Sequence, residues 1–398
     1  MLHHLFSKKL TMKNIKKIAV LRTGGLGDLM VILPALSAIK HTFPGAQLIL
    51  LGEPWQADFV RGGRTPVDQV IVIPFCHNLR QGREEDPAAL EAFFRAMRQK
   101  KIDIAVHFQG KGVAANPFLK KLNARLTVGN SSPGAALPDC SIPFYYYQNE
   151  ITRYLDISGL IGAGPAKPEP QIRVLDEDLA EARSALARHG AGAPYVVLHP
   201  GAMDIRRKWP PAKFARLADI LAGSGYTVLL TGKEKDDPAV EAVLFRMTSR
   251  AVNLSGALSL GGLAGLLSQS EVVISNDTGP LHLARAAGAK TVGIYWAPNF
   301  INWGPLTFSR HRAVISWNME CPLCGTVPND PYPFEPKLPE CDHGISFVRN
   351  ISAKEILEAA GELLGKDLAG KRIEEEQALT DQRYVVKKDN GFQGFAIR

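Results

Sequence analysis

A glycine-rich turn near the start of the chain holds the first residues that could do chemistry. It reads RTGGLGD from Arg22 to Asp28, between a short apolar run and an apolar helical segment. Gly24, Gly25 and Gly27 let a ligand or another backbone approach closely, and a helix N-terminus offers free N–H groups with a partial positive charge. Two interpretations of Asp28 stay open: the N-cap of the helix, or a general base that takes a proton from a hydroxyl group.

A basic loop in the middle of the chain is the second candidate site. It reads HPGAMDIRRKWP from His199 to Pro210, and it follows a predicted strand and precedes a predicted helix. Arg206, Arg207 and Lys208 stand in this loop, and cations beside a helix N-terminus suit a diphosphate group. A solvated basic loop is the alternative, but the glycine and the position at a strand end favour the phosphate interpretation.

The third candidate site reads SNDTGPLH, from Ser275 to His282, and again lies between a strand and a helix. Thr278 and Gly279 would expose backbone N–H groups to a phosphate, and Asp277 would accept hydrogen bonds from sugar hydroxyls. The histidine falls one turn into the helix and faces the same site. A capping residue followed by a core histidine is the alternative, and the basic loop at a neighbouring strand end weakens it.

The cysteines form a fourth pattern, Cys321-Pro-Leu-Cys324 with Cys341-Asp-His343. Three thiols and an imidazole make a plausible zinc ligand set. The Cys-x-His spacing is irregular and a proline-rich loop separates the pairs, so the spacing favours free thiols in a surface loop. The chain has five cysteines, an odd and low number for its length, so a disulfide framework is not expected.

Short apolar runs that alternate with helical segments predict an α/β scaffold for these motifs. The predicted strands span 17–22, 47–51, 67–73, 102–108, 195–199, 227–231, 272–275 and 291–295, and the predicted helices span 29–42, 176–189, 211–222, 260–268, 280–287 and 353–364. The three motifs follow strands, and open α/β sheets bind ligands at the carboxyl ends of strands. A Pro/Gly-rich stretch at 162–170 divides the pattern, which predicts two such units facing each other across a cleft.

We therefore expect four parts. They are a basic arm over 1–16, an N-terminal domain over 17–165, a C-terminal domain over 166–365 and a charged tail over 366–398. The first 17 residues contain five lysines and no acidic residue. This pattern favours a solvated terminus, and peripheral contact with an anionic membrane surface is the alternative.

The composition limits the class of protein. Hydrophobic residues make up 45% and charged residues 22% of the 398 residues, which excludes disorder over the whole chain. No apolar run approaches the ~18 residues of a spanning helix, and the start has no signal-peptide core, so we expect a cytoplasmic protein. The net charge is +8, but no basic stripe is interleaved with aromatic residues, so nucleic-acid binding is not expected.

Together the motifs resemble glycosyltransferase family 9, the bacterial heptosyltransferases of lipopolysaccharide core assembly. The resemblance covers about residues 17 to 364, and it is carried by LRTGGLGDLMVILPAL, HPGAMDIRRKWPPAKFARLA and SGALSLGGLAGLLSQSEVVISNDTGPLHLARAAGAKTVGIY. The CPLCG and ECDHGI segments look like the cysteine-bearing C-terminal loop that is common in this family.

The resemblance implies a GT-B fold of two Rossmann-like domains. The N-terminal domain would receive a glycolipid or glycan acceptor, and the C-terminal domain would hold a nucleotide sugar such as ADP-heptose. The resemblance further implies inverting transfer that uses no metal and no cofactor.

Carried over by motif, Asp28 matches the proposed base of the family. Arg207 stands where the family usually has a lysine that contacts the diphosphate. This departure keeps the charge but changes a compact ammonium to a flat fork, and Lys208 would take part of the role. The other candidates for donor binding are Ala202, Glu234, Asp277, Thr278, Gly279 and His282, of which Glu234 is placed like the acid that holds the nucleoside.

Three alternatives remain beside this interpretation. A nicotinamide-dependent oxidoreductase would need G-x-G-x-x-G, and Met30 occupies the third glycine position. A non-catalytic nucleotide-sugar-binding protein would share the fold and the donor motifs. A family 9-like transferase would use a different nucleotide sugar to build capsule or O-antigen.

Overall fold

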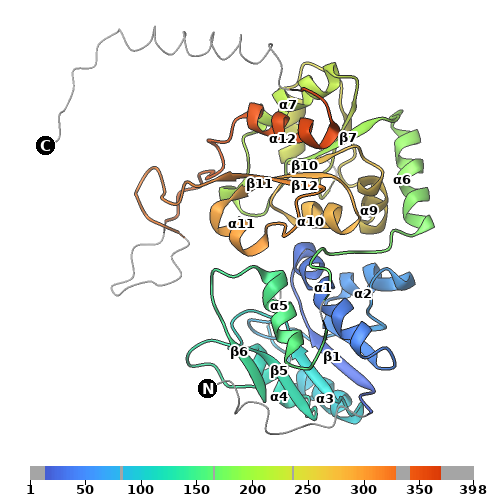
Figure 1. Cartoon of the computed structure of the whole chain (residues 1–398), viewed down its shortest axis with the longest axis vertical. Helices are drawn as coiled ribbons and strands as arrows, with labels where there is room; N and C mark the ends of the chain where they lie inside the picture. The colour runs from blue at the N-terminus through green and yellow to red at the C-terminus, as the bar shows by residue number, and fades with distance from the viewer. Residues whose placement is uncertain (1–13, 81–83, 165, 235–236, 329–340, 369–398) are drawn as a thin grey trace, which may run out of the picture.

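Two α/β domains lie one above the other along the long axis of the molecule (Figure 1). The computed structural model describes residues 14–80, 84–164, 166–234, 237–328 and 341–368. The expected arm and tail therefore lie almost wholly outside the described residues.

A parallel sheet of six strands, in the order β3-β2-β1-β4-β5-β6, forms the centre of the first domain. Its strands are β1 (Lys17–Leu21), β2 (Gln47–Gly52), β3 (Gln69–Val72), β4 (Ile104–His107), β5 (Leu126–Ser131) and β6 (Cys140–Pro143). Its helices are α1 (Leu26–Thr42), α2 (Pro54–Val60), α3 (Pro87–Gln99), α4 (Ala115–Lys121) and α5 (Glu150–Gly159), with a short 3₁₀ turn η1 (Arg61–Gly63).

The second domain repeats this plan with a parallel sheet in the order β12-β11-β10-β7-β8-β9. Its strands are β7 (Tyr195–His199), β8 (Thr227–Leu230), β9 (Val252–Asn253), β10 (Val273–Asn276), β11 (Thr291–Trp296) and β12 (His311–Ser316). Its helices are α6 (Asp176–Arg188), η2 (Ile205–Arg207), α7 (Pro211–Gly223), α8 (Pro238–Leu244), α9 (Leu260–Ser268), α10 (Gly279–Ala286), α11 (Ala297–Trp303) and α12 (Ala353–Leu364).

The central strands are apolar along their length because helices cover both faces of each sheet. Strand β7 is buried at every position, and β1 is buried at all but its first residue. Continuous apolar runs of this kind are typical of parallel strands. The chain order reverses between β1 and β4 and again between β7 and β10. These are the switch points where open α/β sheets bind ligands, and all three site motifs follow β1, β7 or β10.

The predicted strands and helices are present, with ends that differ by at most three residues. The sequence interpretation missed four strands, β5, β6, β9 and β12, together with the helices α2 to α5 of the first domain and α8 and α11 of the second. Strand β6 (CSIP) is only partly buried and β9 has two residues, so neither has an apolar run that would mark it. In the part of the chain that the structure describes, no helix is both long and apolar enough to cross a membrane.

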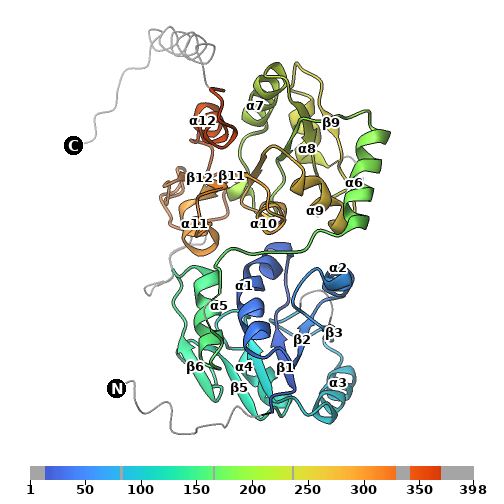
Figure 2. The same cartoon turned by 45° about the vertical axis from the view of Figure 1, so that its right-hand side comes forward.

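The domains touch along a tightly packed joint, which the 160–175 connection crosses between α5 and α6 (Figure 2). Helix α1 of the first domain packs against α10 of the second. Arg64, which follows η1, forms a buried ion pair of 2.5 Å with Asp178 of α6. Elsewhere between the domains, Asn149 Nδ2 of the first domain donates to the backbone oxygen of Gly304 in the second at 3.1 Å. The residues on the two facing helix N-termini, α1 and α10, are therefore held close together.

Candidate active site

Asp28 lies in the first turn of α1, at its third residue. The helix begins at Leu26, and Gly25 is the N-cap with an extended backbone (φ −83°, ψ −177°). The interpretation of Asp28 as the N-cap is therefore wrong in position, because the helix starts three residues earlier than expected. Asp28 instead reaches back, and its Oδ2 accepts a hydrogen bond of 2.7 Å from the Gly25 N–H. Its side chain is 30% exposed, so the carboxylate is both held and reachable.

Arg22 at the end of β1 holds the other oxygen of that carboxylate. Its guanidinium donates to Asp28 Oδ1, to the Phe108 carbonyl and, at 2.9 Å, to the Tyr154 hydroxyl. Burial opposes the charge on Arg22, but the Coulombic effect of Tyr154, Asp28 and Glu150 outweighs it, so the pKa of Arg22 is raised. The structure adds Arg22 to the site as a buried cation that positions Asp28.

Two of the three glycines of the turn, Gly24 and Gly27, have a separate steric reason. Gly24 has φ of +110°, and a Cβ there would lie 2.5 Å from Asp28 Oδ2. A Cβ on Gly27 would lie 3.0 Å from Cδ2 of His282 in the other domain. Glu53, which follows β2, accepts a hydrogen bond of 3.0 Å from the Gly24 N–H. The sequence interpretation missed Glu53, although an acidic residue at a strand end was a signal that could have found it.

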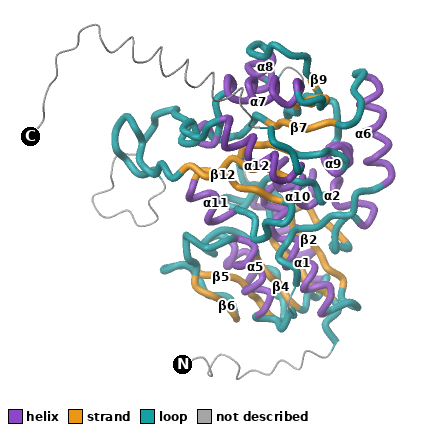
Figure 3. Tube along the Cα trace, turned by 45° about the horizontal axis from the view of Figure 1, so that its top comes forward, coloured by secondary structure: helices purple, strands orange, loops and turns teal. Residues whose placement is uncertain are grey.

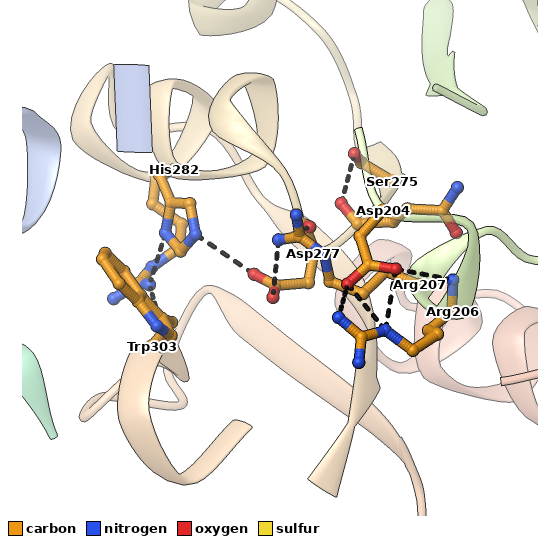
Figure 4. Close-up of polar contacts among 9 residues, drawn as sticks. Asp204, Arg206, Arg207, Ser275, Asp277, His282 and Trp303 are labelled. Atoms are coloured by element: carbon orange, nitrogen blue, oxygen red, sulfur yellow. Dashed lines mark hydrogen bonds and ion pairs between the residues drawn. The ribbon is translucent and has the colours of Figure 1, made fainter. Parts of the chain in front are cut away.

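The basic loop separates its two arginines (Figure 4). The Arg206 fork closes on Asp204, with Nε 2.9 Å from Oδ2 and a terminal nitrogen 2.7 Å from the same oxygen. Arg207 points toward the end of β10, where it donates to the Asp277 carbonyl at 3.1 Å and lies 3.7 Å from Asp277 Oδ2. Both arginines of the basic loop therefore face an aspartate, and the phosphate interpretation of the loop stays a prediction.

Asp277 is a buried carboxylate with a hydrogen-bond partner on one of its two oxygens. Its Oδ1 lies 3.2 Å from His282 Nε2, and its exposure is 1%. Burial opposes its ionisation, but the hydrogen bond from His282 and the charges of His282 and Arg207 outweigh burial, so its pKa is lowered. Its contacts show a role in positioning His282 and Arg207, and direct contact with a sugar hydroxyl stays a prediction.

A chain of polar contacts continues behind His282 into the connection between the domains. Arg285 has a terminal nitrogen 3.5 Å from His282 Nδ1, and Arg285 Nε lies 3.5 Å from Glu169 Oε1. Arg285 also donates to the Trp303 carbonyl at 3.3 Å. Glu169 belongs to the Pro/Gly-rich stretch that the sequence indicated only as a linker. Its role was not visible in the sequence because it depends on contacts more than a hundred residues away.

Asn276, the last residue of β10, joins the second and third motifs. Its side-chain nitrogen donates to the Pro200 carbonyl at 2.7 Å, and its Oδ1 accepts from the Trp209 N–H at 3.1 Å. The loop that carries Arg207 is therefore fixed at both ends to the strand that carries Asp277. This attachment joins the two motifs into one wall of the site, formed by the second domain.

These groups surround a cleft of about 420 Å³ between the domains. The predicted residues that line it are Gly25, Gly27, Asp28, Arg207, Asp277, Thr278, Gly279 and His282. The residues that the sequence did not single out are Leu26, Met203, Asp204, Trp296, Asn299 and Trp303, and Arg206 joins them on the wall. Gly24, Ala202, Lys208 and Glu234 do not line the cleft, and for the last three a role in donor binding stays a prediction.

The electrostatics of the second-domain wall suit an anionic ligand. The N-cap of α10 is Thr278, whose side chain makes no capping hydrogen bond, and the helix N-terminus faces the cleft. Among the described residues, no atom accepts a hydrogen bond from Arg207 Nε, and none donates to Asp277 Oδ2. Buried polar atoms are usually satisfied, so an acceptor atom of a bound ligand would complete the hydrogen bonding of Arg207 Nε, whereas Asp277 Oδ2 already lies 3.7 Å from a terminal nitrogen of Arg207.

A second cavity of about 460 Å³ lies on the other side of the joint, where Trp55 and Phe59 of α2 face α6 and Leu260 of α9. The buried Arg64–Asp178 pair lines it. It contains none of the residues that the sequence motifs predicted, so the cleft at the switch points is the candidate active site.

Two facing Rossmann-like domains with this cleft between them define the GT-B class of glycosyltransferases. A crystal structure of a family 9 glycosyl transferase from Veillonella parvula is similar at a TM-score of 0.69 and 20% identity, covering 88% of this chain and 97% of that one. The structure of Escherichia coli ADP-heptose lps heptosyltransferase II is similar at a TM-score of 0.64 and 18% identity, covering 87% of this chain and 98% of that one.

Sequence comparison gives the family. The sequence model of glycosyltransferase family 9 (heptosyltransferase) matches residues 90–326. The chain is 24% identical over 287 residues to lipopolysaccharide heptosyltransferase 3 of Escherichia coli, covering 70% of this chain and 83% of that protein. The chain belongs to glycosyltransferase family 9 and is a glycosyltransferase.

Proposed function

We propose that this protein transfers a sugar, with inversion, from a nucleoside diphosphate sugar to a hydroxyl group of a surface-glycan acceptor. Heptose from ADP-heptose is the proposed donor group, and the lipopolysaccharide core is the proposed acceptor. The names of the similar proteins support this choice of donor and acceptor. The observation that carries the proposal is the meeting of Asp28, from the first domain, with Arg207 and the α10 N-terminus, from the second, in one cleft.

Asp28 is the proposed general base. As the acceptor oxygen forms its bond to the anomeric carbon, its proton passes to the Asp28 carboxylate. The bond between that carbon and the diphosphate oxygen breaks on the opposite face, and the nucleoside diphosphate leaves with the electron pair. Attack from the face opposite the leaving group inverts the anomeric centre.

The second domain stabilises the leaving group. Negative charge grows on the diphosphate as the bond breaks, and we assign its stabilisation to Arg207 and to the N–H groups at the start of α10, which line the cleft. Lys208 adds charge from the next position. These protein groups neutralise the diphosphate, so we propose that transfer needs no metal at the donor.

A screen of nucleotide sugars followed by a transfer assay tests the function. ADP and ADP-heptose should raise the melting temperature, because a ligand that binds the folded state stabilises it by mass action. With a truncated lipopolysaccharide core as acceptor, sugar transfer should follow and should survive a brief exposure to EDTA.

The outcomes separate the alternatives. Stabilisation by a different nucleotide sugar, with transfer of that sugar, would overturn the heptose assignment and retain the family activity. Binding of ADP-heptose without transfer to any core acceptor would indicate a binding protein. Loss of turnover with EDTA that Mg²⁺ restores would contradict the metal-independent mechanism.

A further inference from the structure

The fourth sequence motif, which the transfer reaction does not use, comes together in space. The ligand atoms of Cys321, Cys324, Cys341 and His343 all lie within 4.8 Å of one another. His343 Nδ1 is 3.7 Å from Cys321 Sγ and 3.6 Å from Cys341 Sγ. A tetrahedral ion with bonds of about 2.3 Å to sulfur and about 2.0 Å to nitrogen would set its ligands about 3.5–3.8 Å apart. The two histidine–sulfur separations have this size, and the other pairs of ligand atoms lie within 4.8 Å of one another.

The local backbone is arranged to present these ligands on one side. The Cys321 N–H donates to the Thr326 carbonyl and the Gly325 N–H donates to the Cys321 carbonyl, both at 2.8 Å. Gly325 has φ of +72°, the left-handed conformation that glycine adopts without strain. The resulting tight turn brings the first two thiols together, while Cys341 arrives from a separate part of the chain. Two separate segments of the chain, 321–324 and 341–343, therefore bring three sulfur ligands and one nitrogen ligand together.

We propose that Cys321, Cys324, Cys341 and His343 bind one Zn²⁺ ion in a closed, structural site. Three thiolates and one imidazole are a ligand set that zinc takes in tetrahedral geometry. Four protein ligands leave no open position for a substrate or a water molecule, and none of the four lines the cleft. The ion therefore fixes the chain and takes no part in transfer.

The structure shows what the ion fixes. The described residues around the cysteines project from the second domain beyond β12 (Figure 3). Hydrogen bonds hold them to the second-domain wall of the cleft on both sides. Before the cysteines, the Asn318 carbonyl accepts a hydrogen bond of 2.8 Å from Trp296 Nε1. After the cysteines, the Phe347 N–H donates to the Arg206 carbonyl at 2.9 Å. The Phe347 ring packs on the Trp296 ring, with the two ring centroids 4.6 Å apart. Zinc closes this loop against the wall that carries Arg206 and Trp296.

Metal analysis of the full-length protein tests the proposal directly. Purified under reducing conditions without added metal, the protein should contain about one equivalent of zinc. The variant Cys324→Ser should lose that zinc, and Cys324 is exposed, so its substitution leaves the core intact. Cys140→Ser is the matched control, because Cys140 lies on β6 in the other domain, and it should retain the metal.

Thiol titration gives a second readout on the unmodified chain. A strong chelator should expose the three ligand thiols to a thiol reagent and release zinc in step with them. Absence of stoichiometric metal would overturn the proposal, as would equal zinc in Cys324→Ser and the parent protein. A stoichiometric content of iron in place of zinc would overturn the assignment of the ion.

One consequence rests on the proposed function. Because the loop supports Arg206 and Trp296, the zinc-free Cys324→Ser protein should bind ADP several-fold more weakly than Cys140→Ser. The metal content does not depend on the donor, so failure of the zinc site and failure of the donor assignment give different results.

Discussion

Arg206 and Arg207 are adjacent in sequence but have different surroundings. Arg206 gives its fork to Asp204, whereas Arg207 reaches the end of β10 and keeps Nε unpaired among the described residues. The sequence indicated both as cations, and the resemblance to the family selected Arg207. Only the fold could show the partners, because Asp277 is 70 residues away in the chain.

Replacement of these arginines should separate their roles. Arg207→Ala should weaken ADP binding by about 2–3 kcal/mol, or about 30- to 150-fold, because it removes a charge-assisted contact to the diphosphate. Arg206→Ala should weaken binding less, because its guanidinium is already paired with Asp204. Calorimetric titration of ADP into each variant measures both losses, and near-zero losses for both would contradict the phosphate assignment.

At the scale of the elements, the decisive feature is the turn between β1 and α1. Strand β1 and the glycine turn could be predicted from the apolar run and the three glycines. The helix start could not, because Gly25 and Asp28 can each cap a helix and the choice depends on Arg22, which fixes the carboxylate from the end of β1. Short strands such as β9 escaped prediction for a different reason, since two residues give no periodicity.

The turn makes a prediction with an internal control. Gly24→Ala places a methyl group 2.5 Å from Asp28 Oδ2, so the carboxylate must move, and transfer should slow by about 10²-fold for a displacement near 1 Å. Gly225 between α7 and β8 also has positive φ, of +90°, but open space around its Cβ position. Gly225→Ala should cost about 1–2 kcal/mol of strain and leave kcat unchanged.

Kinetics and melting curves of the two glycine variants provide the comparison. A loss of rate in Gly24→Ala beyond that in Gly225→Ala assigns the effect to Asp28. Equal rates in both variants and the parent would show that the position of the carboxylate is unimportant.

At the scale of the whole molecule, the site exists only because two domains meet. Two similar α/β halves and a cleft between them were predictable from the repeated strand–helix pattern and the Pro/Gly-rich connection. The close packing of the two domains could not be predicted, because it depends on Gly27 facing His282 and Gly279 facing Leu26 across the interface. Trp303 and Asn299 also line the cleft because of long-range packing, which no local sequence motif indicates.

Substitution of Asp28 tests the central claim, that a base on the first domain acts on a donor held by the second. In Asp28→Asn the side chain keeps its size but can no longer take the acceptor proton. The Asp28 carboxylate accepts one hydrogen bond from the Gly25 N–H and one from Arg22. The amide of Asn has a single oxygen, so one of these two contacts is weakened and the free energy of unfolding should fall by about 1 kcal/mol. With the transfer assay at saturating donor and acceptor, kcat should fall by roughly 10²–10⁴-fold while ADP affinity barely changes. Full activity in a folded Asp28→Asn protein would contradict the account, because the base would then have to lie elsewhere.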